Sequence, residues 1–194
     1  MDPPRWRCFV ALPVPTTVAQ DIERRLAGLH GAWPDARWVP TGDLHVTLAF
    51  LGATPVDRLP AVEGALGEVA RSVRAFEIGL LGAGAFGGRR RPRVAWLGIG
   101  QGETAVRDLV TALGIALAMV PRTASRPHLT LARGAHAGLT SALSERFADG
   151  RPAWAVDELV LYRSHLGPPR ARYEVLVRWT FGGHDGLPRS GRAG

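Results

Sequence analysis

The sequence has no lysine and only one cysteine, and these shortages already exclude some classes of protein. The single Cys8 cannot form a disulfide within the chain, which excludes a disulfide-stapled scaffold; its apolar surroundings predict a buried thiol. No apolar run approaches the roughly 20 residues that a membrane-spanning helix needs, and the first residues lack a signal-peptide cleavage site. We therefore expect a cytoplasmic protein without a membrane partner.

The charge of the chain is strongly one-sided. All 24 residues counted as Lys or Arg are arginines, and the formal net charge is +7. One interpretation is a basic surface for an anionic partner such as nucleic acid, because the guanidinium fork suits phosphate. The other is a compositional bias that replaces Lys with Arg everywhere. The cluster Arg89, Arg90, Arg91 and Arg93 fits either an anion-binding surface or a solvated loop, and its role stays open.

Hydrophobic periodicity and Gly/Pro boundaries predict an α+β fold in which strands pair in antiparallel or mixed sheets and helices flank them. Strands are expected over residues 6–14, 38–39, 43–51, 76–85, 94–99, 127–133, 154–162 and 173–181. Helices are expected over residues 16–30, 59–73, 102–120 and 139–147. Residues 1–181 are expected to form one domain. Residues 182–194 are rich in Gly and Arg with almost no apolar side chain, so a disordered tail is expected there.

Two short phrases nearly repeat. Residues 45–50 read HVTLAF and residues 128–133 read HLTLAR, with five of the six positions matching in type. Such a repeat, with most of a small domain between its copies, indicates an internal duplication. We expect two pseudo-symmetric lobes that each contribute one of these strands to a central cleft.

Each phrase presents a polar pair on one face of a strand, because side chains alternate along a strand. His45 and Thr47 share a face, as do His128 and Thr130. Ala49 and Ala132 are expected to continue this face and leave space. An imidazole gives or takes a proton near neutral pH, and a Thr hydroxyl suits a phosphoryl oxygen. Two such pairs facing one another predict acid–base catalysis of a phosphoryl transfer.

The two histidines could also have structural or metal-binding roles. A single His-x-Thr is usually structural, and duplication for packing alone does not explain two polar residues on the face away from the core. A metal site needs a third ligand; Asp43 precedes His45 with the right parity, but Arg126 stands at the matching place before His128. We therefore expect neither metal nor cofactor. The remaining histidines have no partner pattern and are expected to be solvated: His30, His136, His165 and His184.

The chain resembles the 2H phosphoesterase superfamily, and within it the LigT-like RNA 2′,3′-cyclic phosphodiesterases, also described as 2′-5′ RNA ligases. The resemblance extends to about Phe181. The segments that carry it are RCFVALPVP, RWVPTGDLHVTLAFLG, RPRVAWLGIG, RPHLTLAR and ELVLYRSHLGPPRARYEVLVRW. It implies a bilobal fold and metal-independent opening of a 2′,3′-cyclic phosphate to a 2′-phosphomonoester. It also implies a reverse reaction in which a 5′-hydroxyl attacks.

The resemblance implies roles for individual residues. His45 would be the general acid on the leaving 3′ oxygen and His128 the general base for water, although near-symmetry leaves the two interchangeable. Thr47, Thr130 and Arg133 would bind the phosphate. Strand parity places Arg133 on the opposite face unless the strand ends or bulges, which the following Gly134 permits. The aromatic residues that can pack in the core or stack on a base are Phe9, Phe50, Trp38 and Tyr173.

The substrate expected from these features is an RNA end or a small cyclic nucleotide, acted on by a monomer. Two alternatives remain at the level of sequence. The same chemistry could act on ADP-ribose 1″,2″-cyclic phosphate or on a 2′-5′ oligonucleotide. The chain could also bind RNA ends without turnover, which a missing His or Thr would favour.

Overall fold

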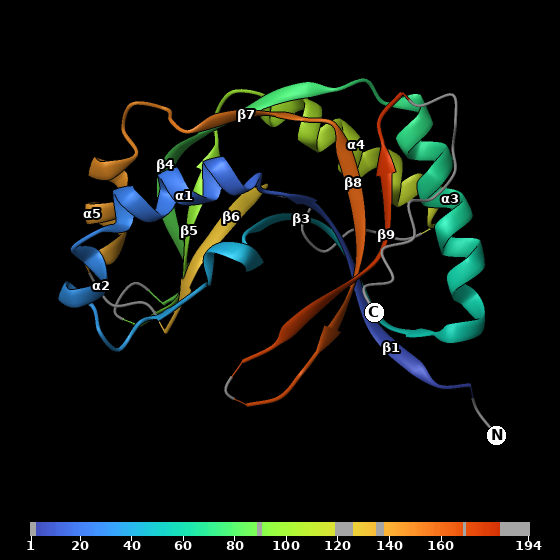
Figure 1. Cartoon of the computed structure of the whole chain (residues 1–194), viewed down its shortest axis with the longest axis horizontal. Helices are drawn as coiled ribbons and strands as arrows, with labels where there is room; N and C mark the ends of the chain where they lie inside the picture. The colour runs from blue at the N-terminus through green and yellow to red at the C-terminus, as the bar shows by residue number, and fades with distance from the viewer. Residues whose placement is uncertain (1–2, 89–90, 119–125, 135–137, 169, 183–194) are drawn as a thin grey trace.

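The computed structural model describes residues 3–88, 91–118, 126–134, 138–168 and 170–182, and within them it contains nine strands and five α-helices (Figure 1). The strands are β1 (Arg5–Pro13), β2 (Arg37–Trp38), β3 (His45–Pro55), β4 (Phe76–Gly88), β5 (Arg91–Ile99), β6 (His128–Arg133), β7 (Ala153–Val156), β8 (Glu158–His165) and β9 (Arg172–Thr180). The helices are α1 (Thr16–Leu26), α2 (Leu29–Ala32), α3 (Leu59–Ser72), α4 (Glu103–Ala116) and α5 (Leu139–Arg146), with short 3₁₀ turns η1 (Thr41–Asp43) and η2 (Val56–Arg58).

One curled sheet runs through the whole described chain in the order β7-β4-β5-β6-β3-β1-β8-β9, with β2 added to β6. Every pairing between its strands is antiparallel. The two strands that carry the repeated phrases, β3 and β6, are neighbours in the middle of this order. The duplicated segments therefore meet where the two halves of the sheet join.

Helices cover each half of the sheet separately. Helix α3 packs on β8 and β9 and against α4, which packs on β3, whereas α5 packs on β4 and β5 and against α1. Figure 1 shows the two groups at opposite ends of the view. The apolar spacing of α3, with Leu59, Leu66 and Val69 buried, supplies the stripe that holds it to the sheet. The predicted α+β class and the two-lobed arrangement are confirmed.

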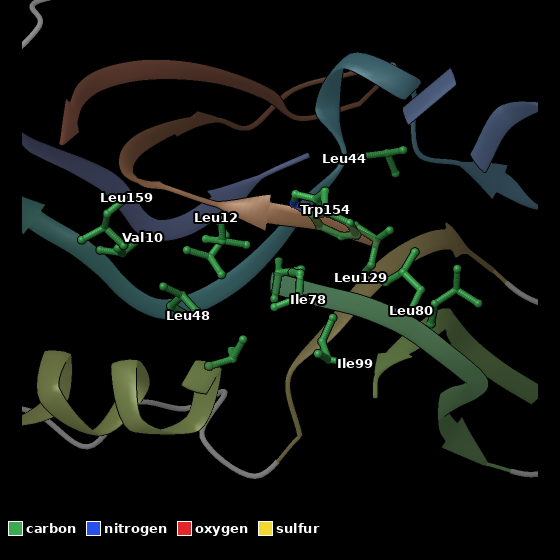
Figure 2. Close-up of a cluster of buried hydrophobic side chains, with 14 of the residues drawn as sticks. Val10, Leu12, Leu44, Leu48, Ile78, Leu80, Ile99, Leu129, Trp154 and Leu159 are labelled. Carbon is green, nitrogen blue, oxygen red and sulfur yellow. The ribbon is translucent and has the colours of Figure 1, made fainter. Parts of the chain in front are cut away.

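A single hydrophobic cluster crosses from one half to the other. Figure 2 shows Val10, Leu12 and Leu48 from one half beside Ile78, Leu80 and Leu129 from the other. Val46, Leu48 and Leu129 have no exposed surface. Burying these aliphatic side chains, at roughly 25 cal/mol per Å² of apolar surface, anchors both central strands from behind. The opposite faces of β3 and β6 are consequently left for polar residues.

The prediction of one strand over residues 154–162 is wrong. The strand is interrupted at Asp157, so that β7 pairs with β4 while β8 pairs with β1 and β9. The Asp157 carbonyl instead accepts a hydrogen bond from the Phe181 N–H, at 2.7 Å. The apolar pattern is continuous because both segments are buried, but their partners lie at opposite ends of the sheet.

Other boundaries also differ from the predictions. The helix expected over 16–30 ends at Leu26, because Gly28 adopts the left-handed conformation (φ 84°), and α2 then begins. The expected loop after residue 85 is partly strand, since β4 extends to Gly88 and β5 begins at Arg91. Arg89 and Arg90 lie outside the described residues. Gly182 is described and donates to the Ala70 carbonyl, whereas the rest of the predicted tail, residues 183–194, also lies outside them.

Candidate active site

The two histidines lie on either side of the seam between the halves of the sheet. Val46 of β3 is directly opposite Leu129 of β6, and the strands are antiparallel. His45 therefore stands toward Thr130, and Thr47 stands toward His128. All four side chains are half-buried and line one cleft of about 700 Å³. The structure thus brings together the four residues that the repeated phrases predicted.

Both phrases contain the same irregularity, which decides where their last residues point. Val10 and Ala11 of β1 pair with Ala49 and Thr47, so Leu48 has no residue opposite it. On the other half, Ala95 and Trp96 of β5 pair with Ala132 and Thr130, which leaves Leu131 unopposed. Two residues facing one is the pattern of a β-bulge, which reverses the alternation of faces beyond it.

The bulges correct one prediction and resolve another. Ala49 and Ala132 do not continue the polar face; both are fully buried. Phe50 and Arg133 take that face instead, and both are exposed and line the cleft. The parity objection to Arg133 fails because strand β6 bulges before it. Beyond each bulge the alanine therefore lies in the core.

Each imidazole is held by the same hydrogen bond. His45 Nδ1 lies 2.7 Å from the carbonyl oxygen of Asp43, and His128 Nδ1 lies 2.8 Å from that of Arg126, two residues upstream in each case. A carbonyl oxygen only accepts, so Nδ1 carries the proton in both rings. In the neutral state Nε2 is then a free base, and in the charged state Nε2–H is an acid. Each histidine is thereby prepared to exchange a proton through Nε2.

Aromatic rings pack against both imidazoles. The ring centroid of His45 lies 5.1 Å from that of Phe9 and 5.2 Å from that of Tyr173. Tyr162 supports this group from behind, stacked on Phe9 at 5.0 Å. On the other half, His128 has Phe86 at 4.8 Å and Trp96 at 5.7 Å.

Burial lowers the pKa of both histidines, and it is the largest influence on each. The Arg133 guanidinium lowers both pKa values further, which places its charge near both rings. The two sites differ in their other neighbours. For His45, the Asp43 carboxylate raises the pKa and His128 lowers it. The seam is therefore symmetric in geometry but not in charge.

The cleft wall is rich in arginine and aromatic side chains. Of the described residues that line it, Asp43 alone carries a carboxylate, whereas five carry a guanidinium group: Arg7, Arg37, Arg126, Arg133 and Arg170. The four aromatic residues considered as stacking candidates, Phe9, Phe50, Trp38 and Tyr173, all line this cleft. Phe9 is only 3% exposed, so its ring is mainly core, whereas Phe50 is 42% exposed. A cationic and aromatic wall suits a ligand with phosphates and bases.

Sequence reasoning missed several residues of this site. Phe86 lines the cleft and touches His128, but it was expected at a loop boundary because the Gly-rich stretch around it hides the strand. Trp96 packs against His128 from β5, a strand that was predicted, but no local signal in the sequence marked Trp96 as part of the site. The alternation of β8, which brings Tyr162 to Phe9, was the one signal that could have located Tyr162.

The prediction that the other histidines are solvated is wrong for His30, whose Nε2 is buried, whereas the side chain of His165 is exposed. His30 is half-buried, packs its ring on Trp38 at 4.7 Å between centroids, and lies 3.5 Å from Glu23. His165 pairs with Glu174 at 2.7 Å. His136 and His184 lie outside the described residues. Among the described residues, no three His, Cys, Asp or Glu side chains are grouped as metal ligands.

The curled antiparallel sheet with two facing His-x-Thr strands defines a phosphoesterase of the two-histidine class. The model of the LigT-like phosphoesterase family matches residues 12–96. The chain is 32% identical over 174 residues to the RNA 2′,3′-cyclic phosphodiesterase of Bacillus subtilis, covering 88% of this chain and 94% of that protein. The chain belongs to the LigT-like phosphoesterase family, and the resemblance read from the sequence is confirmed.

Two further comparisons agree. The chain is 30% identical over 197 residues to the RNA 2′,3′-cyclic phosphodiesterase of Geobacillus stearothermophilus, covering 96% of this chain but only 61% of that protein's length. The crystal structure of Escherichia coli LigT complexed with 3′-AMP matches with a TM-score of 0.67 and 29% identity, over 93% of this chain and 99% of that one. Within the described residues of this chain, no helix is long and apolar enough to cross a membrane.

Proposed function

We propose that this chain is a metal-independent RNA 2′,3′-cyclic phosphodiesterase that opens the cyclic phosphate at an RNA end to a 2′-phosphomonoester. The observation that carries the proposal is the pair of histidines that donate from Nδ1 to a carbonyl and present Nε2 to one cleft. Family membership and the printed activity of the relatives support the same reaction.

The reaction needs one histidine as acid and one as base. Nε2 of neutral His128 takes a proton from water as the water oxygen attacks phosphorus. The bond from phosphorus to the 3′ oxygen breaks, and that oxygen receives a proton from Nε2–H of charged His45. The 2′ oxygen keeps the phosphate. Each proton transfer contributes on the order of 10²–10⁴ in rate.

The assignment of His45 as acid has electrostatic support. The negative charge of Asp43 favours the protonated form of His45, and His128 has no carboxylate among the influences on its pKa. Coulombic attraction between opposite charges stabilises the charged imidazole relative to the neutral one. Asp43 therefore supports His45 as the acid, the role that the family resemblance implies, and acts against the burial and the His128 charge that lower the pKa of His45.

The threonines and Arg133 bind the phosphate. Thr47 and Thr130 each lie beside a histidine and donate a hydrogen bond from the hydroxyl group to a non-bridging oxygen of the phosphate. Arg133 supplies a positive charge as the phosphorus becomes five-coordinate, where charge on the equatorial oxygens grows. Residues 1–181 act in this as one bilobal domain, since each half contributes one His and one Thr. We also retain the prediction of a cytoplasmic monomer.

The same groups catalyse a parallel transfer when a 5′-hydroxyl replaces water. His128 then deprotonates that hydroxyl, and the product is a 2′-5′ phosphodiester. This transfer exchanges one phosphodiester for another, so the site can also cleave a 2′-5′ linkage back to the cyclic phosphate. Water is far more concentrated than any RNA end, which makes hydrolysis the main activity.

The test is product analysis on a short RNA with a 2′,3′-cyclic end, in the presence of EDTA. The expected product is the 2′-phosphomonoester, and His45→Ala and His128→Ala each reduce the rate by roughly 10²-fold or more. His165→Ala is the matched control, because His165 pairs with Glu174 and does not line the cleft. A 3′-phosphate product, dependence on added metal, or full activity of both cleft variants contradicts the proposal.

The same assay separates the alternatives. Turnover of ADP-ribose 1″,2″-cyclic phosphate well above that of the RNA end would reassign the substrate while keeping the chemistry. Binding of RNA ends with steep salt dependence and no product would identify a binding module.

A further inference from the structure

Two exposed phenylalanines face the cleft from opposite halves of the sheet. Phe50 of β3 is 42% exposed and Phe86 of β4 is 41% exposed, and both line the cleft. Each has a buried aromatic partner on the adjacent strand, since Phe50 lies 6.1 Å from Phe9 and Phe86 lies 5.2 Å from Trp96. The cleft therefore has an aromatic platform on each side of the seam.

Each platform accompanies a different histidine. Phe9 of the first pair lies 5.1 Å from His45, whereas Phe86 of the second pair lies 4.8 Å from His128. An aromatic side chain left two-fifths exposed in a cleft keeps apolar surface in contact with water. Its open face is available to a flat ligand, and a nucleobase that stacks on it gains about 1–3 kcal/mol.

A cyclic phosphate end occupies only one of these platforms. Its single terminal nucleoside carries the 3′ oxygen that leaves toward His45, so its base belongs on the Phe50 side. The attacking oxygen enters from the His128 side. When water attacks, no nucleobase lies on that side. When a 5′-hydroxyl attacks, the nucleoside that carries it must lie there.

We propose that Phe86 is the stacking platform for a second nucleoside, the one that carries the 5′-hydroxyl, so that the cleft accepts a 2′-5′-linked pair of nucleosides. This inference rests on the proposed function for the orientation of the phosphate. Phe86 thus provides specificity for a ligand with two nucleosides. Phe50 contacts the nucleoside of the cyclic phosphate, which is common to hydrolysis and to transfer onto a 5′-hydroxyl.

The corresponding step balances without any co-reactant. The proton of the 5′-hydroxyl goes to Nε2 of His128 as the bond from the 5′ oxygen to phosphorus forms. The bond from phosphorus to the 3′ oxygen breaks, and that oxygen takes the proton from Nε2 of His45. The product is a 2′-5′ phosphodiester, and the reverse sequence cleaves it.

Direct binding tests the platform independently of turnover. Isothermal titration calorimetry gives the Kd of a 2′-5′-linked adenosine dinucleoside monophosphate and of adenosine 2′-monophosphate. The wild-type chain is expected to bind the dinucleoside more tightly by about 5- to 150-fold, the worth of one stacked base. In Phe86→Ala and Phe86→Leu this ratio falls toward 1; the leucine keeps apolar bulk against His128.

Two further variants make the comparison specific. Phe50→Ala weakens both ligands together and leaves their ratio unchanged, because the nucleoside on that side is common to both. Leu81→Ala, on the same strand as Phe86 but outside the cleft lining, changes neither Kd.

The outcomes separate the two proposals. A wild-type ratio near 1, or a ratio that survives in both Phe86 variants, overturns the second platform even where cyclic phosphate hydrolysis is intact. Absence of hydrolysis together with a Phe86-dependent ratio overturns the proposed function and leaves the two-nucleoside site standing.

Discussion

Gly84 supports the active site from beneath Trp96, and replacing it with alanine should damage stability and catalysis together. Gly84 is paired with Trp96 across β4 and β5, and the indole is 5% exposed. A Cβ at position 84 would lie 2.7 Å from Trp96 Cε2 and still nearer to two other carbons of the ring. Carbon atoms in contact are separated by about 3.5–4.0 Å, so the indole has to move by about 1 Å or more.

The expected magnitudes follow from where the indole is held. Overpacking of a buried site lowers the free energy of unfolding by about 1–3 kcal/mol. For a chain of this length, each kcal/mol lowers Tm by about 2–4 °C. Trp96 also lies 5.7 Å from His128 and is paired with Thr130. A shift of about 1 Å in catalytic groups can reduce turnover by roughly 10²-fold.

The assay compares Gly84→Ala with Gly64→Ala. Gly64 lies in α3 with nothing within 4 Å of its added Cβ, so that variant should keep its activity and gain slightly in stability. Thermal unfolding gives Tm, and hydrolysis of a 2′,3′-cyclic nucleotide gives kcat. Wild-type Tm and kcat in Gly84→Ala would refute the reasoning, because the indole would then not be confined between Gly84 and the seam.

Three further predictions concern protons and charge at the seam. Because burial lowers the pKa of His45 and His128, the bell-shaped profile of kcat/KM against pH should have its optimum below the ordinary histidine pKa of 6.5. On the acidic side, kcat/KM rises with pH as the general base loses its proton. An optimum above pH 6.5 contradicts this prediction. Asp43→Asn keeps the backbone carbonyl and removes only the charge, so NMR titration of labelled histidine should show a further fall in the pKa of His45 with that of His128 unchanged. Arg133→Gln should raise both pKa values in the same titration and reduce kcat by roughly 10²-fold through lost stabilisation of the phosphate; a drop in kcat without any pKa change would place its charge away from the histidines.

Local patterns were enough to predict most of the scaffold. The apolar spacing of residues 59–73 matches α3 within a residue, because an amphipathic helix depends only on which positions are apolar. The break at Asp157 could not be predicted in this way. Two buried segments in succession look like one long strand, and only their separate partners, β4 for one and β1 for the other, divide them.

The histidines and threonines were predictable for the same local reason. His45 and Thr47 share a parity within one strand, and the repeat of that pattern at His128 and Thr130 required no knowledge of neighbours. The partners of these residues were not predictable. Phe86 and Trp96 reach His128 from strands that the sequence separates from it, and their contact depends on the register of β4, β5 and β6.

The sequence by itself determined that two His-x-Thr strands would be anchored from behind by aliphatic side chains. Alternation along a strand and burial of apolar surface are sufficient for that. Only the tertiary structure decided that Phe50 and Arg133, rather than the two alanines, face the cleft. A β-bulge exists only relative to the strand beside it, because it is a mismatch in the number of residues between two paired hydrogen-bonding ladders. The difference between the two phrases therefore acquired its meaning from β1 and β5.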